Sequence, residues 1–130
     1  MSESSLRLEG ALAWLDRAAE DIRAARHSRD GGFCRNALFL CQQCAEKAIK
    51  GFLIFHDTTF AKTHSITALA DLVSPVDQEL VKVLQKALGL SKYAVAMRYP
   101  GSPYEPDTIE TDSALAIAES VLSAVNSRLS

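Results

Sequence analysis

The sequence predicts an all-α fold, an up-and-down bundle of four long helices plus one short helix. Apolar residues recur with a period near 3.6 along most of the chain, which is the signature of amphipathic helices. No stretch shows the sustained alternation of apolar and polar residues that a half-buried strand requires. Breaks rich in glycine or proline separate the helical stretches, and connections this short favour antiparallel neighbours.

A glycine-rich break separates the first two predicted helices. The first helix runs from about Leu6 to Arg26, and the segment SRDGG follows it. Two adjacent glycines favour a turn over a helix. The second helix runs from about Phe33 to Phe55 and contains CQQCAEKAIK, the densest group of functional side chains in the sequence.

A short third helix and a longer fourth helix come next. The third is expected at about Ile66–Val73. Ser74 is expected to be the N-cap of the fourth helix, with Pro75 at its first helical position and Asp77 near its positive end. Pro100 is expected to end this helix, because proline disfavours helical geometry in the preceding residue.

The last predicted helix starts near Thr111, after the loop PGSPYEPD, and runs almost to the end of the sequence. No low-complexity segment, repeat or linker divides the 130 residues, so we expect a single domain over residues 1–130. A chain of this length buries roughly two-thirds of the surface that its unfolded form exposes. It can therefore form a core without disulfides.

Composition and charge exclude several classes of protein. The sequence is 48% hydrophobic and 23% charged, and no apolar run approaches the ~18 residues of a membrane span. The first ten residues lack the basic-then-apolar order of a secretory signal, so we expect a cytoplasmic protein. A formal net charge of -2 argues against a general nucleic-acid coat but allows a local basic pocket.

The three cysteines are best explained as core residues. Cys34, Cys41 and Cys44 are an odd number and share the apolar side of the second helix, which does not fit a disulfide framework. A structural zinc site usually needs four ligands, and a redox Cys-x-x-Cys motif belongs at a helix start after a strand. Free cysteine behaves as a small hydrophobe. We therefore expect no metal and no cofactor.

The polar residues of the second helix have two interpretations. Gln43, Glu46, Lys47 and Lys50 follow i, i+3, i+4, i+7 spacing, so they are neighbours on one face. They could form a solvated face with a weak Glu46–Lys50 ion pair. However, Phe39 and other apolar residues lie outside the main stripe, and a helix that is apolar on more than one side is central or sits at an interface. Its polar residues would then face a groove.

The segment KTHSI could contribute to such a groove. It places Lys62, Thr63 and His64 just before the third helix, where free backbone N–H groups attract anions. The alternative is local: Thr63 or Ser65 caps the helix, and His64 is a hydrogen-bonded loop residue.

The segment MRYP could contribute as well. Arg98 is expected in the last turn of the fourth helix, where the helix dipole favours a cation without any ligand. Arg98 could instead bind phosphate with its planar fork, and Tyr99 could stack on a base or donate a hydrogen bond.

These segments together resemble the HEPN domain, a nucleotide-binding domain of higher eukaryotes and prokaryotes. QQCAEKAIKGFL, KTHSITALADL and YAVAMRYPGSPYEP occur in this order, and the resemblance covers most of the chain. It implies a bundle of four to five helices, commonly a homodimer, often encoded beside a minimal nucleotidyltransferase in a toxin–antitoxin-like pair. The matching positions are Gln43, Glu46, Lys47, Lys50, Lys62, Thr63, His64, Arg98, Tyr99 and Pro100.

The sequence departs from the family in one respect. Ribonuclease members of the broader superfamily carry an arginine followed, after four to six residues, by a histidine. The histidines here are His27, His56 and His64, and none follows Arg98. RNA cleavage by that motif is therefore not expected, and the missing motif leans against an enzyme.

Three functions fit these observations. The leading hypothesis is a binding module whose cleft holds a nucleotide or another phosphate-bearing ligand, or seats a partner nucleotidyltransferase. The second is a metal-independent ribonuclease, with His64 as general acid or base and Arg98 stabilising phosphorane charge. The third is a helical dimerisation module whose polar residues only fix the bundle.

Overall fold

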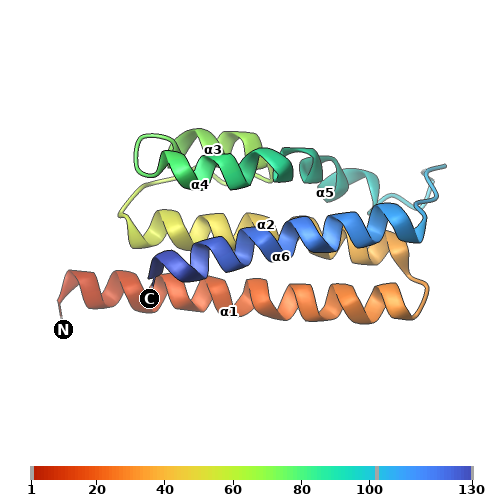
Figure 1. Cartoon of the computed structure of the whole chain (residues 1–130), viewed down its shortest axis with the longest axis horizontal. Helices are drawn as coiled ribbons and strands as arrows, with labels where there is room; N and C mark the ends of the chain where they lie inside the picture. The colour runs from red at the N-terminus through yellow and green to blue at the C-terminus, as the bar shows by residue number, and fades with distance from the viewer. Residues whose placement is uncertain (1, 102, 130) are drawn as a thin grey trace.

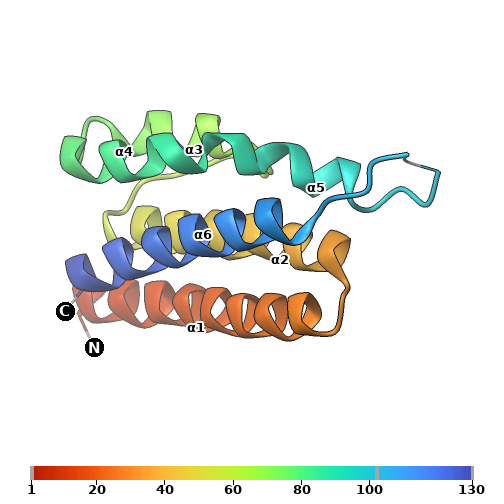
Figure 2. The ribbon, with the colours of Figure 1, turned by 45° about the vertical axis from the view of Figure 1, so that its right-hand side comes forward.

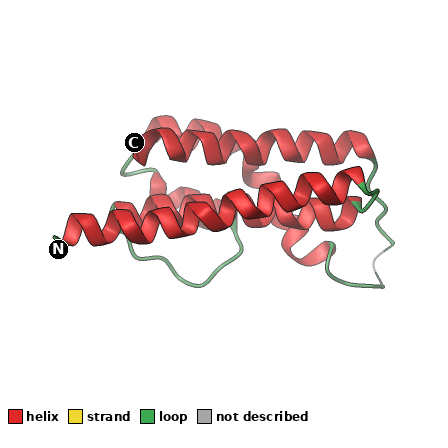
Figure 3. Ribbon diagram, turned by 90° about the horizontal axis from the view of Figure 1, so that it is seen from below, coloured by secondary structure: helices red, strands yellow, loops and turns green. Residues whose placement is uncertain are grey.

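The computed structural model describes residues 2–101 and 103–129 and confirms the all-α prediction (Figure 1). Helices joined by loops make up this part of the chain, which contains no strand (Figure 3). In chain order the elements are α1 (Glu3–Asp30), α2 (Cys34–Phe55), α3 (Ile66–Val73), α4 (Gln78–Leu84), the 3₁₀ helix η1 (Gln85–Lys92), α5 (Tyr93–Ala96) and α6 (Thr108–Leu129).

The helices run up and down along one long axis. α1, α2 and α6 lie side by side, and α3 and the run from α4 through α5 form a layer above them (Figures 1 and 2). α2 is the central element, since it packs against α1, α6, α3, η1 and α5. This position explains why α2 is apolar on more than one side, as the sequence indicated.

α1 and α2 share the most extensive helix–helix contact of the bundle. α1 is longer than predicted, because Ser2 caps its start by accepting from the Ser5 N–H and the helix continues to Asp30. Gly32 then turns the chain with φ +86°, a conformation that favours glycine. A Cβ on Gly51 would lie 3.1 Å from the Ala11 carbonyl oxygen, so glycine allows this approach.

The prediction for the start of the fourth helix was wrong. Ser74 ends α3, with its N–H donating to the Ala70 carbonyl. Asp77 is the N-cap instead: its side chain accepts from the Leu80 N–H and also binds Arg128 of α6, at 2.7 Å. A carboxylate with two partners outcompetes a serine whose backbone is already used by the previous helix.

The predicted fourth helix is one continuous run with a change of pitch in its middle. Its central eight residues, η1, form a 3₁₀ helix, which is long for this geometry. Gly89 lies within η1, and the Ser91 hydroxyl accepts from the Ile66 N–H at 2.9 Å, which ties η1 to the start of α3. The run ends at Ala96, so Arg98 lies in a turn just beyond the helix and not in its last turn.

The core lies between α2 and the elements around it. Cys41 and Cys44 are fully buried there, which confirms their packing role, whereas Cys34 at the start of α2 is only partly buried. α6 begins at Thr108, three residues before the predicted start, because the Asp107 side chain accepts from the Glu110 N–H. None of the helices in the described part of the chain is long and apolar enough to cross a membrane.

Candidate functional site

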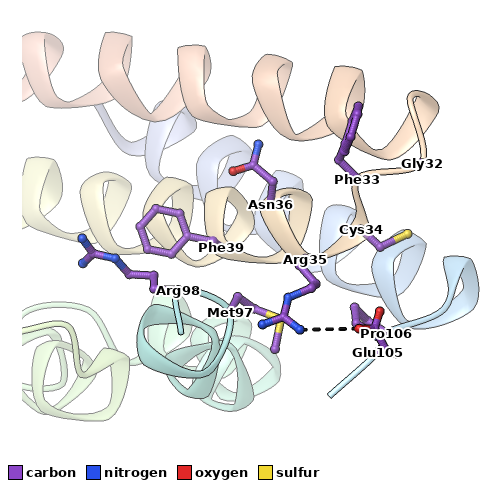
Figure 4. Close-up of a pocket in the computed structure, with 10 residues that line it drawn as sticks. All are labelled: Gly32, Phe33, Cys34, Arg35, Asn36, Phe39, Met97, Arg98, Glu105 and Pro106. Carbon is purple, nitrogen blue, oxygen red and sulfur yellow. Dashed lines mark ion pairs between the residues drawn. The ribbon is translucent and has the colours of Figure 1, made fainter. Parts of the chain in front are cut away.

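Two polar regions lie along α2. The first is a cluster that we call the Glu46 network, made of Gln42, Gln43, Glu46, Lys50 and His64. The second is an open depression of about 600 Å³ near the start of α2, which we call the Arg98 groove. It is lined by Gly32, Phe33, Cys34, Arg35, Asn36, Phe39, Met97, Arg98, Glu105 and Pro106 (Figure 4).

The Glu46 carboxylate is the centre of the first region. Its Oε1 accepts from Gln42 at 2.9 Å and lies 2.8 Å from Nδ1 of His64, while its Oε2 accepts from Lys50 Nζ at 2.9 Å. Gln42 also donates to the His64 backbone carbonyl, and Gln43 donates to Gln42. Glu46 is 4% exposed and Lys50 6%, so this cluster is a buried polar network.

These contacts keep Glu46 ionised. Burial alone would raise the pKa of its carboxyl, but the hydrogen bonds from Gln42, His64 and Lys50 together outweigh burial and lower that pKa. A carboxylate only accepts hydrogen bonds, so Nδ1 of His64 carries the hydrogen between them. The His64 side chain is 55% exposed, and its other ring nitrogen is therefore left for solvent or a ligand.

The other positively charged residues of the first two motifs occupy different environments. Lys50 lies over the rings of Trp14 and Phe60, 5.7 Å from each centroid, so its ammonium is enclosed by aromatic groups as well as by Glu46. Lys47 pairs with Asp21 of α1 at 2.7 Å. Lys62 is exposed in the loop before α3.

The loop before α3 is held by local hydrogen bonds. Ser65 is the N-cap of α3, since its hydroxyl accepts from the Ala68 N–H. The Thr63 hydroxyl accepts from the Ser65 N–H at 3.0 Å. Of the two residues expected to cap this helix, Ser65 is the N-cap, and Thr63 binds the backbone N–H of that serine.

In the second region, Arg98 has an environment unlike that of the lysines. Its guanidinium lies over the Phe39 ring, 5.4 Å from the centroid (Figure 4). Within residues 2–101 and 103–129, no carboxylate lies close enough to form an ion pair with it, whereas Lys47 and Lys50 are both paired. Arg98 is therefore a positive charge at the edge of the depression, with its guanidinium beside Phe39 and directed away from Arg35 and Glu105 (Figure 4).

The start of α2 opens into the same groove. The N-cap is Phe33, whose side chain cannot cap the helix, and the first turn holds no acidic residue. Cys34, Arg35 and Asn36 of that turn line the groove. The positive end of a helix favours anions, so this end adds to the field of Arg98.

The loop between α5 and α6 forms the opposite wall and is fastened at Tyr104. Arg35 donates from Nη1 to the Tyr104 carbonyl and from Nη2 to the Tyr99 carbonyl, each at 2.9 Å.

Glu110 of α6 accepts from the hydroxyls of Tyr93 and Tyr104. Burial and this bond raise the pKa of Tyr93, and the bond to Glu110 raises the pKa of Tyr104 to about 12. Both phenols therefore stay protonated donors.

Comparison with known proteins identifies the family. The model of the HEPN domain matches residues 11–128, which is nearly the whole sequence. This chain belongs to the HEPN family. The resemblance inferred from the three motifs is thereby confirmed.

Two solved structures and one curated protein resemble this HEPN domain. The crystal structure of TT1696 from Thermus thermophilus is 31% identical, with a TM-score of 0.71 over 90% of this chain and 96% of that one. The structure described as ST0689, an archaeal HEPN homologue, is 28% identical, with a TM-score of 0.70 over 92% of this chain and 98% of that one. A protein of Methanocaldococcus jannaschii named "Putative toxin MJ1304" is 25% identical over 140 residues, covering 96% of this chain and 91% of the relative.

The three motifs of the HEPN domain meet on one face of α2, but not at one point. His64 contacts Glu46, and Arg98 contacts Phe39. Phe39 and Glu46 are seven residues apart on nearly the same side of the helix, so these two docking points are separated by about 10 Å along its axis. Gln43 lies between them in the sequence of α2.

Sequence reasoning missed Arg35 as a member of the groove, although a signal was present. A cation in the first turn of a helix is disfavoured by the helix dipole, so Arg35 there indicated a compensating partner. The partners are the carbonyls of Tyr99 and Tyr104, some 65 residues away in the chain. No local pattern encodes that contact.

Proposed function

We propose that this HEPN domain binds a phosphate-bearing ligand, a nucleotide, in the Arg98 groove. The observation that carries the proposal is Arg98, which lines the edge of the groove beside Phe39 and has no ion-pair partner among the described residues. A guanidinium in that position offers several donors to phosphate oxygens. A volume of about 600 Å³ also lies within the usual range of small-molecule sites.

Aromatic groups beside Arg98 support a nucleotide over inorganic phosphate. Phe39 lies under the guanidinium, Phe33 at the groove edge is 68% exposed, and Tyr99 is exposed next to Arg98. Aromatic faces bind bases by stacking without discriminating strongly between them. We therefore assign phosphate contact to Arg98 and base contact to one of these rings.

The remaining motif residues receive supporting roles in this proposal. Lys47 pairs with Asp21 of α1, and Glu46 binds both Lys50 and His64 of the loop before α3, so these charges are used inside the protein. Gln43 and His64 border the same face of α2, and Lys62 and Thr63 lie in the loop that carries His64. The ligand is thus placed toward the start of α2.

Thermal unfolding with added nucleotide tests this function. The probes are AMP, ADP and ATP, and the key variant is Arg98→Ala. At about 100 times the dissociation constant, a ligand adds about 2.7 kcal/mol to stability, which we expect to raise the Tm of the wild type by about 10 °C. Arg98→Ala should lose this rise. Arg23→Ala is the matched control, because Arg23 on α1 is also exposed and outside any ion pair among the described residues.

Two results would contradict the proposal. One is a wild type whose Tm none of the three nucleotides changes. The other is an Arg98→Ala variant that keeps the full rise, which would place the ligand elsewhere.

The proposal extends to partners, on the strength of the family resemblance. We propose a homodimer that acts with a minimal nucleotidyltransferase in a toxin–antitoxin-like pair, consistent with a relative named as a toxin. Large exposed apolar side chains, among them Phe33 in the groove and Ile109 (79% exposed) in the first turn of α6, support an interface. Light scattering of the wild type should give twice the mass of one chain. Ile109→Asp should give the mass of a single chain. Co-purification with a co-expressed nucleotidyltransferase tests the second partner.

The geometry of His64 favours a second candidate, a metal-independent ribonuclease. A buried carboxylate orients Nδ1 and leaves the exposed Nε2 side for proton transfer, an arrangement that suits a general acid or base. Under this hypothesis a labelled RNA pool is shortened in the presence of EDTA. His64→Ala and Arg98→Ala should each stop the cleavage, and Arg23→Ala should not. Intact RNA in the wild-type reaction excludes this candidate.

A further inference from the structure

In the part of the chain that the structure describes, His64 is the one histidine whose ring is bonded to a carboxylate. Its Nδ1 lies 2.8 Å from Oε1 of Glu46, and its side chain is 55% exposed, whereas Glu46 is buried. The ring thus lies between the closed middle of α2 and the solvent. His27 is near the end of α1, and the His56 ring packs on Phe52 with the ring centroids 4.4 Å apart.

Glu46 determines which ring nitrogen of His64 carries the hydrogen in the neutral form. Burial raises the pKa of the Glu46 carboxyl, but the hydrogen bonds from Gln42, His64 and Lys50 outweigh burial and lower that pKa. The resulting carboxylate can only accept, so Nδ1 of His64 donates to it. The hydrogen bond at one ring nitrogen sets the state of the other, so the lone pair of the neutral ring is on Nε2, the nitrogen away from Glu46.

We propose that His64 is a phosphoryl acceptor, phosphorylated on Nε2 by an activated phosphate donor of the phosphoramidate or acyl phosphate class. The Nε2 lone pair attacks the phosphorus atom and forms a new N–P bond. The bond between phosphorus and its leaving group breaks, and the electron pair of that bond departs with ammonia from a protonated phosphoramidate or with the carboxylate of an acyl phosphate. This activity goes beyond the proposed nucleotide binding and needs no ligand in the Arg98 groove.

Glu46 supports this step as a positioning residue. Because Nε2 gives its lone pair to phosphorus while Nδ1 keeps its hydrogen, the ring becomes a positively charged imidazolium. The Glu46 carboxylate is hydrogen-bonded to that ring and stabilises its charge, as a carboxylate does for the imidazolium of a serine protease triad. Gln42 holds the loop in place by donating to the His64 backbone carbonyl at 3.1 Å. Lys62, exposed in the same loop, adds positive charge where an anionic donor approaches.

Phosphoramidate is the probe for this reactivity, and the other two histidines are controls within the same molecule. The wild type is incubated with potassium phosphoramidate near neutral pH, and the modified positions are located by mass spectrometry without acid, because phosphohistidine is acid-labile. We expect His64 to be modified about tenfold faster than His27 or His56, which is the effect of one hydrogen bond to a charged group. A parallel reaction with acetyl phosphate distinguishes the two donor classes.

Glu46→Gln separates positioning by the carboxylate from a structural role of His64. Nuclear magnetic resonance of the ring nitrogens reports the tautomer, and we expect the hydrogen on Nδ1 of His64 in the wild type and a loss of this preference in Glu46→Gln. The rate of phosphorylation at His64 should fall about tenfold, to that of His27. Glu79→Gln is the matched control, because Glu79 forms an exposed ion pair with Lys82 on a different helix, and it should leave tautomer and rate unchanged.

The inference is overturned if His64 of the wild type reacts no faster than the other two histidines, or if its ring hydrogen is on Nε2. It is also overturned if Glu46→Gln, shown by circular dichroism to be folded, is phosphorylated at the wild-type rate, since His64 would then only tie the loop to α2. If Glu46→Gln does not fold, the comparison of the three histidines in the wild type decides. None of these results depends on nucleotide binding, so either proposal can fail while the other stands.

Discussion

The Glu46 network and the Arg98 groove lie on the same helix and show opposite uses of charge. In the network, a buried carboxylate accepts hydrogen bonds from Gln42 and Lys50 and holds His64. In the groove, Arg98 rests on an aromatic ring and faces open space. The first arrangement is closed on itself, and the second is open to a ligand.

The difference follows from burial. A charge that is removed from water must find partners inside the protein, because an unpaired buried charge is very unfavourable. α2 is central and packs against α1, α6, α3, η1 and α5, and Glu46 and Lys50 in its middle are buried and pair with each other. Its start lies at one end of the bundle, where solvent stabilises an unpaired guanidinium until a ligand arrives.

Removing Glu46 should give the largest loss of stability in this region. Glu46→Ala leaves Lys50 buried without its partner, which typically lowers the free energy of unfolding by about 3–5 kcal/mol. Urea denaturation monitored by circular dichroism measures the change. Glu79→Ala breaks an exposed ion pair within one helix, between Glu79 and Lys82. It should change the free energy of unfolding by no more than about 0.5 kcal/mol.

A comparable loss of unfolding free energy in Glu46→Ala and Glu79→Ala would show that the Glu46 network is not shielded from solvent. The middle of α2 would then be open to solvent like its start. The contrast between the two regions would have no energetic basis.

The pH dependence of stability should distinguish the network from the groove as well. The folded-state pKa of Glu46 is lowered, so its contribution is complete above the ordinary glutamate pKa near 4.5 and is lost as the pH falls through the folded value. Glu46→Gln mimics the protonated state. We expect the difference in unfolding free energy between wild type and Glu46→Gln to be constant near pH 7 and to shrink below about pH 4.5.

Other carboxyls with lowered pKa, such as Asp77 and Asp112, are present in both proteins. They cancel in the difference. A difference that stays constant down to acid denaturation would mean that Glu46 is not preferentially ionised in the folded state.

The fold was largely predictable because it depends on local patterns. Periodicity placed α2 within one residue at each end and α3 at its observed bounds. The start of the fourth helix was not predictable in this way. Asp77 is the N-cap in place of Ser74 partly because it also binds Arg128, which is 51 residues away in the chain. The hydrogen bond from the Ile66 N–H to the Ser91 hydroxyl, which joins η1 to α3, is likewise a tertiary contact that no local pattern indicates.

The candidate site was predictable only as a set of segments. The motifs indicated Glu46, His64 and Arg98, and all three lie on one face of α2. The sequence could not show that Lys47 is paired with Asp21 of α1, since helical spacing describes neighbours within one helix. It also could not show that the loop after Arg98 returns to Arg35, because proline-rich loops carry no period.

Removing Arg98 should have a much smaller effect on stability than removing Glu46. Its cation–π contact with Phe39 is exposed, and such contacts contribute about 0.5–1 kcal/mol. Arg98→Ala should therefore shift the urea midpoint slightly while abolishing nucleotide binding. If Arg98→Ala destabilised the protein as much as Glu46→Ala, Arg98 would be a structural residue and the groove would lose its free cation.

Cysteine reactivity should give the smallest and most local signal. Burial raises the pKa of Cys41 and of Cys44 to about 12, and both side chains are fully enclosed, whereas Cys34 lines the groove. The thiolate is the reactive form, so a disulfide reagent should modify one thiol per chain in the native protein and three in denaturant. Saturating ADP should slow the modification of Cys34 a few-fold, because the ligand covers the groove.

Cys34→Ser supplies the control for this measurement, since its native form should lack a fast-reacting thiol. Modification of all three thiols at one rate would indicate that the core opens as readily as the groove. ADP could raise the Tm and yet leave the rate of Cys34 modification unchanged. That result would place the nucleotide outside the Arg98 groove. The one partly exposed thiol thus reports directly on the open end of α2, while its two buried neighbours report on the closed middle.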